Sequence, residues 1–136
     1  MLSNLNYLRK EMLKKSIITL MLISTFASSS LFAKNAQLLS LAAQQVKLTK
    51  KISHAYQSKA SSASILSSIK TLEMGQIKLK KQAKHTSEIK NLLVYLNICV
   101  KELKALVRKP YSRENAQKVV DYGVSISEGS RYIAKS

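Results

Sequence analysis

The chain has 136 residues, with 23 Lys and Arg against 7 Asp and Glu and a formal net charge of +16. A single cysteine excludes an intramolecular disulfide, and the length suits one domain behind an N-terminal segment. The positive charge favours contact with anionic surfaces and small anions and carries no information about the fold.

The N-terminal part has the pattern of a secretory signal peptide. Lys14 and Lys15 precede an uncharged apolar run, Ile17–Ala33. A positive start, an apolar core and a small final residue are typical of such a peptide. We therefore expect residues 1–33 to be cleaved and the rest to be periplasmic or secreted. The alternative is an uncleaved helix that anchors the protein to the inner membrane, since a spanning helix needs about 20 apolar residues.

The remaining segment, residues 34–136, is expected to be one domain. It holds 19 Lys and Arg against 6 Asp and Glu, a net charge of +13. Met12 would also serve as a start, so residues 1–11 are interpreted as an extension without a role in the fold.

Four segments of this domain carry apolar residues at steps of three and four, the spacing of one helical stripe. The stripes run from Leu38 to Ala55, from Ile65 to Ala83, from Ile89 to Leu106 and from Ala116 to Ile133. Three glycines and one proline are too few for a sheet with many turns. The sequence predicts an all-α, up-down-up-down antiparallel four-helix bundle, preceded by the signal or anchor helix.

Polar residues mark the ends of these helices. A break is expected at Ser61 and Ser62. A hydroxyl within residues 85–88 (HTSE) is placed to cap the third helix, and Ser112 is placed to cap the fourth. Pro110 disfavours helical geometry in the residue before it, so the third helix should end there.

The predicted core is weakened by polar residues on its stripes. A domain of this size with such a core is marginally stable. We therefore expect a homodimer through a second apolar face, formed by Leu39, Val46, Leu66, Leu93, Val120 and Val124.

Residues 35–56, NAQLLSLAAQQVKLTKKISHAY, resemble the first helix of a known sensor domain. The family is the periplasmic N-terminal domain of type IV pilus methyl-accepting chemotaxis transducers (PilJ-type), related to nitrate/nitrite sensors (NarX-type). Residues 86–103 are similar to its third helix. The matching positions of the first helix are Asn35, Leu39, Ala42, Gln45, Leu48, Ile52, Ala55 and Tyr56. The resemblance implies a non-enzymatic, sensor-like bundle that binds a small ligand or a membrane-bound signalling partner.

The sequence departs from this family where the nitrate-sensing members bind their anion. Val46 replaces the family Arg, and Lys50 and Lys51 replace a Gln-Arg pair. An Arg fork grips a planar oxyanion, whereas Lys is a point charge, so nitrate recognition is not expected. The candidate anion-binding residues are Gln45, Lys47, Lys50 and Lys51; the alternative is a solvated basic face.

A second function class rests on charge alone. The lysines between Lys70 and Lys84 form a basic run. They suit a structural or surface-associated envelope protein that binds anionic lipid, polysaccharide or an acidic partner. Export argues against nucleic acid as the physiological partner.

No catalytic constellation, metal site or cofactor site is expected. His54 and His85 lack other ligands at metal-binding spacing, and Cys99 is interpreted as a small packed residue.

Overall fold

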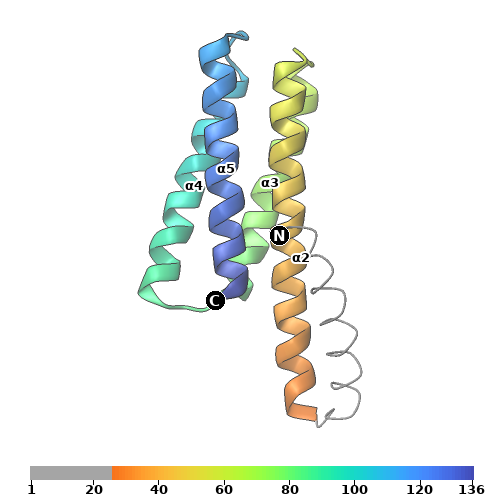
Figure 1. The fold of residues 1–136 in the computed structure, drawn as a ribbon, viewed down its shortest axis with the longest axis vertical. Helices are drawn as coiled ribbons and strands as arrows, with labels where there is room; N and C mark the ends of the chain where they lie inside the picture. The colour runs from red at the N-terminus through yellow and green to blue at the C-terminus, as the bar shows by residue number, and fades with distance from the viewer. Residues whose placement is uncertain (1–25) are drawn as a thin grey trace, which may run out of the picture. The chain divides into compact units, whose positions relative to one another are not determined.

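The protein is all-helical over the described residues. A computed structural model describes the backbone of residues 26–136 and the side chains of residues 35–136. The helices are α2 (Phe26–Gln57), α3 (Ser62–Gln82), α4 (Ser87–Val107) and α5 (Arg113–Lys135), and residues 26–136 contain no strand. These helices form a four-helix bundle (Figure 1). The predicted all-α fold with four helices is confirmed.

The chain divides into two units, residues 1–33 and residues 34–136, and the core lies in the second. The predicted signal peptide occupies the first unit, and its residues 1–25 lie outside the described residues. Within residues 26–136, no helix combines the length and the apolarity that crossing a membrane requires.

Side-chain caps start three of the helices. Ser61, Thr86 and Ser112 each accept a hydrogen bond from the backbone N–H three residues ahead, with distances of 3.4, 3.2 and 3.0 Å. Such a cap satisfies a backbone donor that has no partner inside the helix. The predicted cap at Ser112, the predicted helix start within residues 85–88 and the predicted break at Ser61 are confirmed, and Thr86 is the residue that caps α4.

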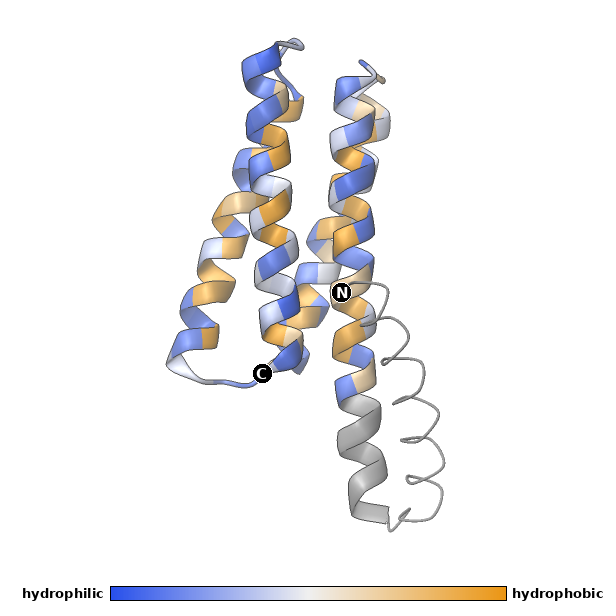
Figure 2. Ribbon diagram, viewed as in Figure 1, coloured by the Kyte–Doolittle hydropathy of each residue, from blue (hydrophilic) through white to orange (hydrophobic). Residues whose placement is uncertain are grey.

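The core consists of two apolar clusters. Figure 2 shows apolar and polar residues alternating along each helix. The first is built around the fully buried residues Ile52, Ile69, Leu72, Leu103 and Ile126. The second includes Leu38, Ala42, Leu79, Leu96 and Ile133. On α2, α3 and α5, polar residues separate the two clusters along the sequence: Gln45, Thr49, Gln76, Ser127 and Ser130. A polar layer therefore divides the core.

Glycines allow close packing around this layer. Gly129 of α5 faces Leu96 of α4, so closely that a Cβ at residue 129 would lie 2.5 Å from a Leu96 methyl carbon. A Cβ at Gly123 would lie 3.4 Å from Cβ of Thr49 on α2. Gly129 is therefore needed for the packing of α5 on α4, whereas a side chain at residue 123 would make an ordinary contact with α2.

The predicted second apolar face is not one exposed surface. Val46 is buried, and Leu66, Leu93 and Val120 are half-buried, because these side chains turn toward the neighbouring helices. Only Leu39 and Val124 of that set are exposed. The predicted homodimer through these six residues stays a prediction.

Candidate anion-binding groove

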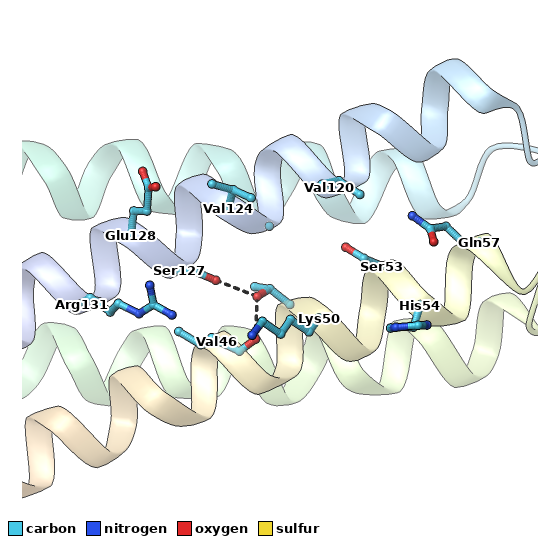
Figure 3. Close-up of a pocket in the computed structure, with 12 residues that line it drawn as sticks. Val46, Lys50, Ser53, His54, Gln57, Val120, Val124, Ser127, Glu128 and Arg131 are labelled. Atoms are coloured by element: carbon cyan, nitrogen blue, oxygen red, sulfur yellow. Dashed lines mark hydrogen bonds between the residues drawn. The ribbon is translucent and has the colours of Figure 1, made fainter. Parts of the chain in front are cut away.

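A groove of about 410 Å³ lies between α2 and α5 (Figure 3). Residues at steps of three and four line it from both sides, with Val46, Lys50 and Ser53 on α2 and Val124 and Arg131 on α5. This spacing places the lining residues of each helix on a single face. The volume is within the range of about 300–1,000 Å³ that is usual for small-molecule sites.

The floor of the groove is fixed by hydrogen bonds. The Thr49 hydroxyl donates to the carbonyl oxygen of Val46 over 2.9 Å. Its oxygen lies 2.8 Å from the Ser127 hydroxyl, and because Thr49 has only one hydroxyl proton, Ser127 is the donor of that second bond. The hydrogen bond between Thr49 and Ser127 joins α2 to α5 beneath the groove.

Two cationic side chains reach into the groove. Lys50 comes from α2 and Arg131 from α5, and Figure 3 shows them pointing toward one another. Among residues 35–136, the salt bridges are Lys104–Glu73 and Lys118–Glu114. Lys50 and Arg131 therefore have no carboxylate partner there.

The other polar groups of the groove leave this positive charge in excess. Glu128 also lines the groove and is its one acidic residue, while Ser53, His54 and Gln57 lie along α2. A guanidinium can hold an oxyanion by two parallel hydrogen bonds, and an ammonium adds a point charge. The arrangement can thus bind a small oxyanion between the two helices.

The four residues proposed from the sequence occupy three different places. Lys50 lines the groove. Lys47 and Lys51 are exposed and lie outside it. Gln45 is fully buried, and its amide nitrogen donates to the carbonyl oxygen of Leu72 on α3 over 3.0 Å. Only Lys50 of this set is brought to the groove.

Arg131 is the functional candidate that the sequence did not reveal. Its position becomes informative only once α2 and α5 are known to be neighbours. One signal was available, because Arg131 lies four residues after Ser127 and eight after Gly123, on the α5 face that carries these small residues. Arg131 thus brings a guanidinium to the groove from α5.

Two titratable groups elsewhere in the described chain have shifted pKa values. Cys99 is buried, and burial raises the pKa of its thiol above the usual value of 9.0. Tyr132 donates to the Glu88 carboxylate, and this hydrogen bond raises the pKa of the Tyr132 phenol. Across residues 35–136, no three His, Cys, Asp or Glu side chains come together to hold a metal ion.

Comparison of the chain with protein-family models, curated proteins and solved structures found no match.

Proposed function

We propose that this protein is a non-enzymatic, sensor-like helical bundle that binds a small anionic ligand in the groove between α2 and α5. The observation that carries the proposal is the convergence of Lys50 and Arg131, which have no acidic partner among residues 35–136. The fixed floor at Thr49 and Ser127 supports it, because a pre-organised site loses less entropy on binding.

The proposal includes the bundle topology and the place of action. Helices joined by the short connections 58–61, 83–86 and 108–112 favour an up-down-up-down arrangement. The signal-peptide pattern of residues 1–33 favours a periplasmic or secreted protein. The resemblance to PilJ-type and NarX-type sensor domains favours a role in signalling, through a membrane-bound partner or as a homodimer.

Thermal unfolding in the presence of anions tests the proposal. Sodium succinate and sodium phosphate are compared with sodium chloride at equal ionic strength. A ligand that binds only the folded state adds about 2.7 kcal/mol of stability at a hundredfold excess over Kd. We expect succinate or phosphate to raise Tm saturably, and chloride to lack this effect.

Four variants that each remove one positive charge, two inside the groove and two outside it, locate the site. Lys50→Gln and Arg131→Gln should abolish the saturable rise, whereas Lys47→Gln and Lys51→Gln, which remove the same charge outside the groove, should retain it. An equal response of all four variants would show that charge alone acts, and would contradict the proposed site.

A further inference from the structure

Large apolar side chains are exposed on α3 and α4, away from the α2–α5 groove. Met74 and Ile77 of α3 are 53% and 56% exposed, and Val94 and Ile98 of α4 are 62% and 52% exposed. Each pair is separated by three or four residues, so each lies on one face of its helix. An isolated exposed apolar residue is ordinary, but four on two neighbouring helices call for an explanation.

Two of these residues, Ile77 and Val94, lie beside the contact between α3 and α4. The two helices are in contact, and Lys104 of α4 reaches Glu73 of α3 over 3.4 Å. Ile77 lies one turn from Glu73, and Ile98 follows Val94 by one turn on α4. At about 100° per residue, Ile77 lies about 40° from Glu73 around α3, and Val94 lies about 80° from Lys104 around α4. Ile98 lies farther around α4, about 120° from Lys104. Ile77 and Val94 therefore flank the seam on its outer side, with Met74 and Ile98 beyond them; we call this surface the α3–α4 face.

Lysines surround the apolar residues. Helical periodicity places Lys70 and Lys81 of α3, and Lys90 and Lys101 of α4, on the outer sides of their helices, and all four are exposed. Glu73, the acid at the seam, is already paired with Lys104. Glu102, which is also exposed on α4, offsets only part of this charge. The α3–α4 face thus combines exposed apolar residues with a lysine rim of net positive charge.

We propose that the α3–α4 face docks on an anionic lipid bilayer. The lysines would meet the headgroup charges, each contributing to binding, and the apolar side chains would enter the boundary between headgroups and acyl chains. A bilayer satisfies both features of the face at once. A second copy of the chain would instead bring two lysine rims together, and like charges across an interface are unfavourable.

A fluorescent label on the face tests this docking in the full-length chain. Cys99→Ala removes the only native thiol and keeps a small side chain in the core. In that background, Val94→Cys carries an environment-sensitive fluorophore on the α3–α4 face. Val124→Cys is the matched control, since Val124 is an exposed valine of the α2–α5 groove, 48% exposed.

The labelled proteins are titrated with vesicles of phosphatidylcholine containing phosphatidylglycerol, and with vesicles of phosphatidylcholine alone. We expect a blue shift of the residue 94 label with the anionic vesicles only, and no shift of the residue 124 label. Comparing the two labels separates docking of the α3–α4 face from insertion of the N-terminal apolar segment. Insertion of that segment alone would not move the residue 94 label into the bilayer in preference to the residue 124 label.

A charge-matched pair of variants adds a second readout. Each lysine near an anionic surface strengthens binding by about fivefold. The double variant Lys81→Gln with Lys101→Gln should therefore need a lipid concentration about twenty-five times higher for the same blue shift. Lys47→Gln with Lys51→Gln carries the same net charge and should weaken binding far less.

Several results would overturn the proposal. These are equal shifts of the two labels, no shift at residue 94, or equal weakening by the two lysine pairs. A shift at residue 94 that grows with protein concentration in the absence of vesicles would assign the face to a second copy. A shift with polyglutamate but not with vesicles would assign it to an acidic polypeptide.

Discussion

Gln45 is a fully buried amide whose two ends have different environments. Its nitrogen donates to the Leu72 carbonyl, whereas its oxygen has no hydrogen-bond partner within the described part of the chain. The oxygen packs against Gly75, where a Cβ would lie 2.3 Å away. An unsatisfied buried acceptor costs about 1–3 kcal/mol, so Gln45 lowers the stability of the bundle at this point.

Replacement of this amide by an apolar side chain should therefore be tolerated. We predict that Gln45→Leu raises the free energy of unfolding by about 1 kcal/mol, because it removes the unsatisfied oxygen. Succinate binding should be unchanged, because Gln45 does not line the groove. Urea denaturation and a succinate titration of the same variant check both parts. If Gln45→Leu folds normally but no longer binds succinate, Gln45 takes part in binding, contrary to this prediction.

The two glycines of α5 offer a matched pair of substitutions. Gly129→Ala should destabilise the protein by about 1 kcal/mol, since overpacking against buried Leu96 costs about 1–3 kcal/mol and helix propensity returns at most about 1 kcal/mol. Gly123→Ala meets Thr49 at a tolerable 3.4 Å and should be neutral or slightly stabilising. Chemical denaturation of both variants gives the comparison. A Gly129→Ala protein as stable as the wild type would contradict the described packing of α4 on α5.

Cys99 should behave as a buried, neutral thiol. Its pKa is raised in the folded state by burial, so the folded protein holds the thiol proton more tightly than the unfolded chain does. The associated stability is complete below about pH 9 and is lost as the pH rises through the folded-state pKa. We predict slow alkylation by iodoacetamide in buffer and fast alkylation in urea. A steeper loss of stability above pH 9 is expected for wild type than for Cys99→Ala. Rapid native alkylation would place Cys99 at the surface.

At the scale of the helix, local side-chain chemistry determines where the elements begin. Thr86 caps α4 through the Ile89 N–H, and Ser112 caps α5 through the Asn115 N–H. Both caps, the break at Ser61 and the four apolar stripes were predictable, because each depends on residues a few positions apart. Which helix lies beside which is a different kind of information. The α2–α5 neighbourhood, and with it Arg131, follows from packing that periodicity does not specify.

The α4 cap can be tested against a threonine inside a helix. Thr86→Ala should lower the free energy of unfolding by about 1 kcal/mol, because the Ile89 N–H loses its acceptor. Thr71→Ala is the control, since Thr71 is exposed on α3 and bonds only back to Ser67, and its effect should be near zero. Equal losses in the two variants, measured by urea denaturation, would show that the Thr86 cap contributes nothing of its own.

At the scale of the whole molecule, the bundle separates two basic regions. One is the α2–α5 groove with Lys50 and Arg131, and the other is the α3–α4 face with its lysine rim. The excess of positive charge and the basic run from Lys70 to Lys84 were evident in the sequence. The sequence also placed Gln45, Lys47, Lys50 and Lys51 in one candidate site. A helix distributes such neighbours over different sides, so the bundle leaves only Lys50 in the groove.

The glycine amide signals test the anion site most directly, because the chain has only three glycines and only Gly123 lines the groove. Protein labelled with 15N-glycine is titrated with sodium succinate, and the Gly123 signal is identified by its absence in Gly123→Ala. We predict that this signal moves saturably while the Gly75 signal stays in place, and that Lys50→Gln with Arg131→Gln abolishes the movement. An unmoved Gly123 signal, or a movement of all three signals that sodium chloride reproduces at equal ionic strength, would contradict an anion site between α2 and α5.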